Sequence, residues 1–450
     1  MKIQIPAQVE FIIRKLSGSG YEAYLVGGCV RDAILGENPH DWDIATSALP
    51  EEAKTALCGC KLIETGLKHG TITVVVDGIP VEITTYRIDG EYLDSRHPKE
   101  VRFTPSLKED LARRDFTINA LAYNQTDELI DCFNGIADIA NKKIRCVGEP
   151  SLRFQEDSLR ILRALRFSSV LGFCIDKKSS DCIFQFYPLL DRIARERIQS
   201  EFSKMLCGKN AENILREYRI VIQQFLPDIA PMAGFRQNNP HHIYDVWEHT
   251  LKSVSAVNPT PILRLTMLLH DIGKPLCYTQ DENKVGHFYG HAEISANIAR
   301  KALTNLKYDN HTVDSVTELV KLHGLALSPD EKLIKRRLNQ LGEEKLRLLL
   351  KVKAADIEAK SPNYRNRLLE IKEIESVINR IIEQNQCFSI KDLRVNGKDL
   401  LSVGIPEGPE VGRTLSSLLQ AVIDGQCSND FHSLISYAQE MKDEDNDRNS

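Results

Sequence analysis

Apolar and polar residues follow two different patterns along the 450-residue chain. Between Tyr24 and Tyr123 the apolar residues form short β-rich runs, and two of these runs flank Asp77-Gly78, a strong signal for a hairpin turn. Beyond about Leu152 the strand signals nearly vanish, and apolar residues recur at helical spacing from Leu159 onward. The pattern therefore predicts an α+β first part followed by a mostly all-α remainder.

Stretches rich in turn-forming residues divide the chain further. Residues 148–150, 231–240 and 397–412 combine glycine, proline and polar residues, which is typical of joints between domains. A chain of this length is also too long for a single hydrophobic core. We expect four domains, at residues 1–147, 148–230, 231–390 and 391–450.

Composition predicts a soluble protein. Its content of 42% hydrophobic and 27% charged residues is near the globular average. The sequence has no run of about 18 apolar residues, the length needed to cross a bilayer, and no apolar core of a secretion signal at its start. We expect a cytoplasmic protein that has no contact with membranes.

Net charge argues against a protein that coats nucleic acid by overall charge, and cysteine usage argues against a zinc-ribbon or disulfide-rich protein. The net charge is −5, so any nucleic acid must be bound by local patches instead of by overall charge. The eleven cysteines are scattered and contain no C-x-x-C pair, which disfavours both a zinc ribbon and a disulfide framework. We expect reduced, mostly buried thiols.

The first candidate for chemistry is a glycine turn. The run Leu25-Val26-Gly27-Gly28-Cys29-Val30-Arg31-Asp32 ends an apolar segment with two glycines and then offers Arg31 near a helix start. Backbone N–H groups at such a turn can approach a phosphate closely, and a guanidinium adds a charged fork. Because Gly-Gly turns are common, this signal is weak by itself.

Two aspartates strengthen the case. In Asp41-Trp42-Asp43 the carboxylates are two residues apart, so in an extended strand they point to the same face. Side by side they need a counter-charge, and two Mg²⁺ ions would supply it in a nucleotidyl transfer. We predict Asp41 and Asp43 as the catalytic metal ligands and Glu82 as a third ligand, although Glu82 is nearly as compatible with a solvated strand.

A third segment supplies positive charge. Arg113-Arg114-Asp115 precedes an apolar run, and paired arginines suit the oxygens of a triphosphate. Asp115 could accept a hydrogen bond from a ribose hydroxyl. The motif means little in isolation.

Four motifs in this order resemble those of the class II tRNA nucleotidyltransferase and bacterial poly(A) polymerase family: Gly27-Gly28-x-Val30-Arg31-Asp32, Asp41-x-Asp43, Arg113-Arg114-Asp115 and Glu156-Asp157-x-x-Arg160. The resemblance implies a small nucleotidyltransferase head, followed by helical neck, body and tail domains, with Mg²⁺ on Asp41 and Asp43. It also implies nucleotide contacts from Gly28, Arg31, Arg114, Asp157, Arg160, Arg163 and Arg166.

Residues 154–166 have the pattern of one helix with polar groups at steps of three. Asp157 only accepts hydrogen bonds and Arg160 only donates them, so together they match the base edges of cytosine and adenine. Uracil and guanine would leave buried polar groups unpaired, at about 1–3 kcal/mol each. We expect this pair to select CTP and ATP; a solvated helix with an ion pair is the alternative.

Several activities share these motifs. The polar segment from Tyr86 to Pro105 has the character of a mobile loop, and in this family such a loop is associated with the switch from C to A addition. Its presence favours addition of C-C-A to the 3′ end of tRNA from CTP and ATP. An A-adding enzyme and a poly(A) polymerase remain open. So does a phosphohydrolase with a nucleotide-binding head, although the aspartate pair argues against it.

A second site is predicted in the helical half. The run Leu268-Leu269-His270-Asp271-Ile272-Gly273-Lys274 resembles the HD-domain metal phosphohydrolases. Imidazole and carboxylate ligands suit Ni²⁺, Mn²⁺ or another divalent metal that activates water against a phosphoester, and Asp271 could bridge two ions. A first metal would be bound by His249, His270, Asp271 and Asp356, and a second would lie near His291 and His323.

The segment from Lys332 to Lys353 is strongly basic, with eight cations against Glu343 and Glu344. Such a run can be a solvated helix face, or it can contact the phosphates of a tRNA acceptor stem. The sequence favours neither interpretation.

Overall fold

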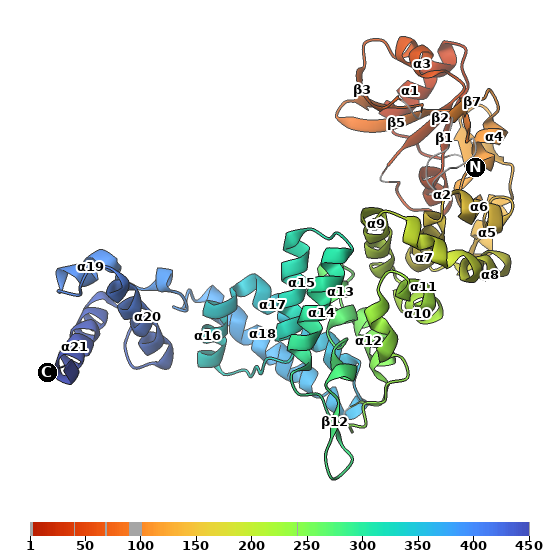
Figure 1. Cartoon of the computed structure of the whole chain (residues 1–450). Coiled ribbons are helices and arrows are strands. Elements are labelled where there is room, and N and C mark those ends of the chain that lie inside the picture. Colours follow the sequence, from red (N-terminus) through yellow and green to blue (C-terminus); the bar gives the residue numbers. More distant parts are fainter. Residues whose placement is uncertain (1–2, 40, 68–69, 90–100, 241, 450) are drawn as a thin grey trace. The chain divides into compact units, whose positions relative to one another are not determined.

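The computed structural model describes residues 3–39, 41–67, 70–89, 101–240 and 242–449 (Figure 1). The chain forms two compact units. The first comprises Met1–Pro227 together with Thr304–Tyr308, and the second comprises Asp228–Leu303 and Asp309–Ser450. The boundary lies close to the predicted joint that begins at Pro231. The finer division into four domains stays a prediction.

A seven-stranded mixed sheet forms the centre of the first unit, with strand order β3-β4-β5-β2-β1-β8-β9. Neighbouring strands are antiparallel except for the parallel pair β2 and β5. The strands are β1 (Ala23–Val26), β2 (Asp43–Thr46), β3 (Lys61–Gly66), β4 (Thr71–Val76), β5 (Ile79–Thr85), β8 (Leu121–Asn124) and β9 (Glu128–Asp131).

The predicted hairpin is confirmed. Strands β4 and β5 are joined by Asp77 and Gly78, which both have positive φ angles, of 49° and 81°. Positive φ at both central residues of a two-residue turn matches the right-handed twist of the flanking strands. Pairing of β5 with β2 then brings Glu82 into register with Asp43.

Short helices and a second ribbon complete the head. Tyr86, Leu111 and Ala122 belong to a buried apolar cluster of this region. The remaining elements are α1 (Ala7–Gly18), α2 (Gly28–Ile34), α3 (Pro50–Ala56), β6 (Arg87–Asp89), β7 (Val101–Phe103), α4 (Leu107–Ala112), η2 (Thr117–Asn119), α5 (Gly135–Ala140) and β10 (Lys143–Ile144). In the loop predicted from Tyr86 to Pro105, β6 pairs with β7, and residues 90–100 lie outside the described residues.

From Pro150 onward the elements of the first unit are mainly helices, close to the expected change near Leu152. They are α6 (Pro150–Glu156), α7 (Leu159–Leu171), α8 (Lys177–Phe186), α9 (Arg195–Leu206), α10 (Ala211–Glu217) and α11 (Arg219–Gln223), with the short strand β11 (Cys174–Ile175) paired to β10. The expectation of one continuous helix over residues 154–166 is wrong. The chain leaves the helical conformation at Asp157, where φ is −138° and ψ is 102°, and α7 begins two residues later.

Among the described residues of the second unit the strands are the two-residue β12 (Thr279–Gln280) and β13 (Gly286–His287), and the other regular elements are helices. Its helices are α12 (Val246–Ala256), α13 (Pro261–Leu269), α14 (His291–Asn305), α15 (Asn310–Leu322), α16 (Glu331–Leu341), α17 (Glu343–Glu358), α18 (Arg367–Glu383), α19 (Gly397–Ser402), α20 (Pro409–Asp424) and α21 (Phe431–Asn449). Separate apolar clusters lie under α16–α18 and within α19–α21. Of the helices in the described part of the chain, none is long and apolar enough to cross a membrane.

Candidate active sites

The glycine turn lies between β1 and α2. Gly27 has a φ of 79°, a value that glycine adopts without strain, and its carbonyl accepts a hydrogen bond from the Arg31 N–H at 3.2 Å. A Cβ atom on Gly27 would lie 3.0 Å from Nη1 of Arg114. The absence of a side chain therefore lets Arg114 approach the turn at which α2 begins.

The predicted head carboxylates gather near the start of β2. Asp43 is the first residue of that strand, whereas Asp41 lies in an exposed bend before it, so the two do not share a regular strand face. Glu82 is the register partner of Asp43 on the parallel strand β5 and is exposed. Burial raises the pKa of Asp43 to about 6, and the charges of Glu82 and Asp41 act in the same direction while Arg114 opposes them. Mutual repulsion of this kind favours a bound cation.

A cavity of about 450 Å³ opens beside Asp43. The eight residues that we predicted to bind nucleotide all line it: Gly28, Arg31, Arg114, Asp115, Asp157, Arg160, Arg163 and Arg166. They come from segments far apart in the sequence, and most are arginines. The cavity is therefore suited to a polyanion next to a carboxylate cluster.

Buried acids hold several of these arginines in place. Asp110 on α4 pairs with Arg113 at 2.8 Å and with Arg114 at 3.4 Å. Asp115 pairs with Arg163 on α7 at 2.7 Å. Although burial raises the pKa of Asp115, Arg163 outweighs it and the pKa falls to about 2. Asp115 is thus an anchor for Arg163 in this structure, in addition to lining the cavity.

Asn119 is a cavity residue that the sequence analysis missed. Its Oδ1 accepts a hydrogen bond from Nη1 of Arg31 at 2.6 Å, and its Nδ2 donates to Oδ1 of Asp115 at 3.2 Å. The side chain therefore links the glycine-turn motif to the Arg-Arg-Asp motif. Its position four residues after Asp115 was the available signal.

The break between α6 and α7 positions the residues predicted to read the base. Asp157 accepts from the Leu159 N–H at 3.1 Å and pairs with Arg197 of α9 at 3.0 Å. Arg160 donates to Glu156 at 2.8 Å and to the carbonyl of Arg113 at 2.9 Å. Asp157 and Arg160 thus both line the cavity with separate partners, and the described contacts contain no ion pair between them. Arg197 was not predicted, because forty residues separate it from Asp157.

Phe167 was also missed, and it organises three of the arginines. The guanidinium carbons of Arg31, Arg163 and Arg166 lie 5.2, 5.5 and 4.1 Å from the centre of its ring. An edge-on contact with Phe116 also restrains the ring. The negative face of an aromatic ring attracts cations, so Phe167 stabilises a cluster of like charges that would otherwise repel one another.

The structure brings together all six residues predicted for the second site. They come from three helices, α12, α14 and α17, and from the residues that directly follow α13 and α15: His249, His270, Asp271, His291, His323 and Asp356. Among the described residues, two groups have ligand atoms that all lie within 4.8 Å of one another, and both belong to this set. The head carboxylates, which are also described, are not among these groups.

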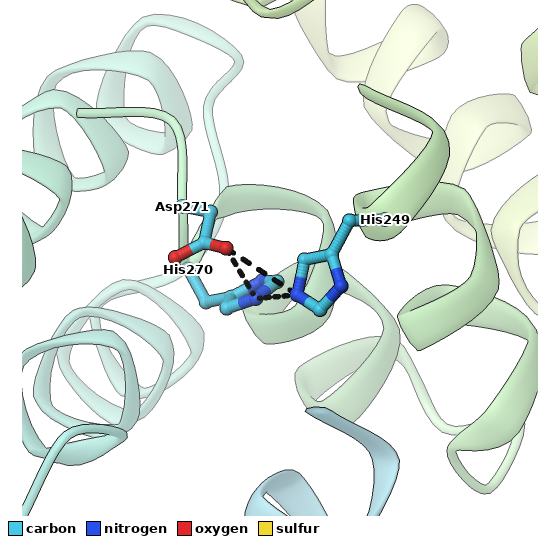
Figure 2. A group of neighbouring side chains, drawn as sticks. All are labelled: His249, His270 and Asp271. Atoms are coloured by element: carbon cyan, nitrogen blue, oxygen red, sulfur yellow. Dashed lines mark hydrogen bonds and ion pairs between the residues drawn. The ribbon is translucent and has the colours of Figure 1, made fainter. Parts of the chain in front are cut away.

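The first group is His249, His270 and Asp271 (Figure 2). Nε2 of His249 and Nε2 of His270 are 3.4 Å apart, and they lie 3.4 and 3.2 Å from Oδ2 of Asp271. Asp356 borders this group, since its Oδ1 is 3.1 Å from Nε2 of His249 and 3.8 Å from Nε2 of His270, but it is not one of the three residues whose ligand atoms all lie within 4.8 Å of one another. Two imidazole nitrogens and one carboxylate oxygen thus lie close together, with a second carboxylate beside the imidazoles, and ligands of these types suit a divalent metal.

Asp271 also belongs to the second group. Its other oxygen, Oδ1, lies 3.5 Å from Nε2 of His291 and 3.7 Å from Nε2 of His323, and these two nitrogens are 3.1 Å apart. Each oxygen of one carboxylate therefore faces a different pair of imidazoles. This arrangement is consistent with the predicted bridging role of Asp271.

Backbone carbonyls select the tautomers of three histidines. Nδ1 lies 2.7 Å from the Met267 carbonyl in His270, 2.7 Å from the Phe288 carbonyl in His291 and 2.6 Å from the Val320 carbonyl in His323. A carbonyl only accepts, so Nδ1 carries a proton, and in the neutral ring Nε2 keeps its lone pair. Such outer contacts orient metal-binding imidazoles.

The lowered pKa values of three imidazoles also favour a bound metal. Burial lowers the pKa of His249, of His291 and of His323, the last to about 3, so these imidazoles are neutral at pH 7. Burial also acts to lower the pKa of His270, but Asp271 and Asp356 raise it overall. Neutral imidazole is the form that binds metal ions.

Four of the eight cations in the basic run on α16 and α17 form ion pairs within the protein. Lys335 contacts Glu331 at 3.0 Å, Lys345 contacts Glu318 at 2.6 Å and Arg347 contacts Glu343 at 2.9 Å. Arg336 pairs with Asp424 of α20. Exposed pairs of this kind support the interpretation of a solvated face over that of a phosphate-binding surface.

The family models that match this chain cover much of the cavity in the first unit. Residues 23–145 match the model described as the poly A polymerase head domain, a class of nucleotidyltransferase. Residues 172–232 match a probable RNA- and SrmB-binding site of polymerase A, and residues 279–438 match a putative domain 2 of tRNA nucleotidyltransferases.

Relatives that align over almost the whole chain show which nucleotidyltransferases it resembles. A CCA-adding enzyme from Enterococcus faecalis is 35% identical, covering 96% of this chain and 95% of that relative, and one from Leuconostoc citreum is 34% identical with 97% and 96% covered. The solved Bacillus stearothermophilus CCA-adding enzyme in complex with CTP aligns with a TM-score of 0.74 at 30% identity, covering 99% of this chain and 100% of that one. The chain belongs to the family of CCA-adding enzymes.

Proposed function

We propose that the chain extends the 3′ end of tRNA with C-C-A, using CTP and ATP and releasing pyrophosphate. The observation that carries this proposal is the cavity in which the eight expected nucleotide-binding residues meet Asp43. Family membership supports the same activity.

In the proposed reaction the 3′-hydroxyl oxygen of the RNA bonds to the α-phosphorus of the nucleotide. The bond from that phosphorus to the pyrophosphate oxygen breaks, and the hydroxyl proton is released. Asp41, Asp43 and Glu82 would hold Mg²⁺, which supplies positive charge for both oxygens when bound. Arg114 and Arg31 would orient the triphosphate beside the glycine turn.

Base choice is assigned to Asp157 and Arg160. Both line the cavity, and one can accept from the amino group of cytosine or adenine while the other donates to the neighbouring ring nitrogen. Uracil and guanine would place donors and acceptors in the reverse order. In Asp157→Ala we expect weaker discrimination against UTP and GTP; unchanged discrimination would remove this residue from base selection.

One assay distinguishes C-C-A addition from A addition alone and from poly(A) synthesis. The protein is incubated with tRNAs that end at the discriminator base, at C or at C-C, with labelled CTP and ATP supplied separately and together. C-C-A on the first tRNA supports the proposal, A on the C-C end alone identifies an A-adding enzyme, and long A tails identify a poly(A) polymerase. Asp43→Asn serves as the inactive control.

We propose a second activity, hydrolysis of phosphoesters at the histidine–aspartate site of the second unit. The favouring observation is that Asp271 faces one imidazole pair with each of its oxygens. These residues would hold Ni²⁺, Mn²⁺ or another divalent metal, which supplies an activated water when bound. His270, His291 and His323 present Nε2 because backbone carbonyls occupy Nδ1.

Metal analysis and hydrolysis test this second activity together. We expect the purified chain to bind a transition metal and to cleave 2′,3′-cyclic or p-nitrophenyl phosphates with added Ni²⁺ or Mn²⁺. Asp271→Asn should lose both properties while keeping nucleotide addition in the first unit. A wild-type protein without bound metal and without hydrolysis would assign these residues a structural role.

A further inference from the structure

A second cavity, of about 460 Å³, opens from the histidine–aspartate site. Asp271, Asp356, His291 and His323 line it. Its wall also carries cations that no metal-binding role requires: Lys274, Lys353, Lys360 and Arg367. A ligand in this cavity would therefore lie beside these side chains.

The cations differ in their partners. Lys274 contacts Asp271 at 2.7 Å, Lys360 contacts Asp356 at 2.7 Å, and Arg367 pairs with Glu370 at 3.4 Å. Each of these charges is therefore compensated within the protein. Lys274 and Lys360 support the proposed ligand carboxylates, and Arg367 belongs to the cavity wall.

Lys353 of α17 differs from these three cations. Its Nζ donates to the His323 carbonyl at 2.9 Å, and none of the described carboxylates forms an ion pair with it. The side chain is half-buried and lies one helical turn before Asp356. An ammonium group has three donors, so two remain after the bond to the carbonyl. Removing such a charge from water is costly unless a ligand compensates it.

We propose that Lys353 binds a phosphoryl oxygen of the phosphoester that enters this cavity. The inference rests on the proposed hydrolase function of the same site and names the residue that recognises its substrate. A phosphoryl group offers several charged acceptors, and charge-assisted hydrogen bonds to them are about twice as strong as neutral ones. This ammonium group, which forms no ion pair with a described carboxylate, thus matches the anion that the metals would also attract.

The test compares three variants of the full-length chain. Lys353→Met removes the charge and keeps most of the apolar stem, and Lys353→Arg keeps the charge. Lys351→Met makes the same change at an exposed position of the same helix. Binding of inorganic phosphate is measured by calorimetry with and without Mn²⁺, alongside metal content, melting temperature and the KM for p-nitrophenyl phosphate.

We expect Lys353→Met to retain metal and melting temperature but to bind phosphate roughly ten- to a hundredfold more weakly, the effect of losing a hydrogen bond to a charged group. The KM for p-nitrophenyl phosphate should rise by a similar factor. Lys353→Arg should recover most of both, and Lys351→Met should match the wild type.

Phosphate affinity that is unchanged in Lys353→Met would overturn the inference, as would loss of the metal from that variant, which would make Lys353 a support of the ligands. Failure of the hydrolase proposal has a different signature: the wild type itself binds no metal and cleaves no ester. In that case weaker phosphate binding by metal-free Lys353→Met would still support the anion site, and equal binding would reject it.

Discussion

Arg197 of α9 pairs with Asp157 at the break between α6 and α7, with Nη2 3.0 Å from Oδ2. The contact fixes the carboxylate that is proposed to read the base. In Arg197→Met we expect Asp157 to lose its orientation, so kcat/KM for CTP and ATP should fall by roughly tenfold, the effect of one charged hydrogen bond, and UTP and GTP should be incorporated more often. Single-nucleotide incorporation assays measure both effects.

Lys204→Met provides the control for this prediction, because Lys204 is an exposed residue of the same helix. Its kinetics should match those of the wild type. Arg197→Met with unchanged base discrimination would show that Asp157 holds its position without α9.

Phe167 should affect nucleotide binding through the three guanidiniums around its ring. Each cation–π contact contributes roughly 0.5–2 kcal/mol, so in Phe167→Leu the KM for nucleoside triphosphates should rise several-fold, while Phe167→Tyr keeps the aromatic face and should stay near the wild type. Phe202→Leu is the matched control: Phe202 is buried on α9 and packs against Phe225. It should lower the melting temperature without changing KM. Equal KM values in Phe167→Leu and Phe202→Leu would contradict the positioning role.

Gly27→Ala should weaken triphosphate binding for two separable reasons. The positive φ strains any residue with a Cβ by about 1 kcal/mol, and the new methyl group would meet Arg114 at 3.0 Å. Gly36→Ala adds only the strain, since Gly36 has a φ of 77° and open space around it. We expect both variants to lose stability and only Gly27→Ala to raise KM. A raised KM in both would assign the effect to backbone strain.

The ion pair of Asp115 and Arg163 makes a pH-dependent contribution to stability. Because the pKa of Asp115 is lowered from 3.8 to about 2, the ionised form stabilises the fold above about pH 4, and this stabilisation disappears as the pH falls toward 2. Asp115→Asn should therefore cost about 2 kcal/mol at pH 7 and progressively less below pH 4.

Urea unfolding in a Trp247→Phe background reports on this prediction, because Trp42 is then the only tryptophan and lies in the first unit. The background protein and its Asp115→Asn variant are compared at pH 7 and at pH 3. We expect the difference between their free energies of unfolding to be smaller at pH 3. A difference that stays constant or grows on acidification would contradict the assignment.

The sequence predicted residues of both sites that the structure brings together, most of those in the first site from short motifs and those in the second from a spaced series of histidines and aspartates. The hairpin at Asp77-Gly78 was predictable from turn chemistry, and the expected nucleotide-binding residues do meet in one cavity. The interruption at Asp157 was missed because helical periodicity continues across it. Asp and Ser at that point are residues that favour helix starts, so a signal was present. Arg197 and Phe167 carry no local signal, since their roles arise from the packing of α9 and from three distant side chains.

The helix break has a consequence for transplanting base specificity between relatives. Asp157 is oriented by a residue of a different helix, so the Glu-Asp-x-x-Arg segment is not a self-contained module. A chimera that exchanges only this segment would separate Asp157 from Arg197, the residue that orients it. Exchanges that carry α7 and α9 together would preserve the geometry, and we expect only these to transfer nucleotide preference.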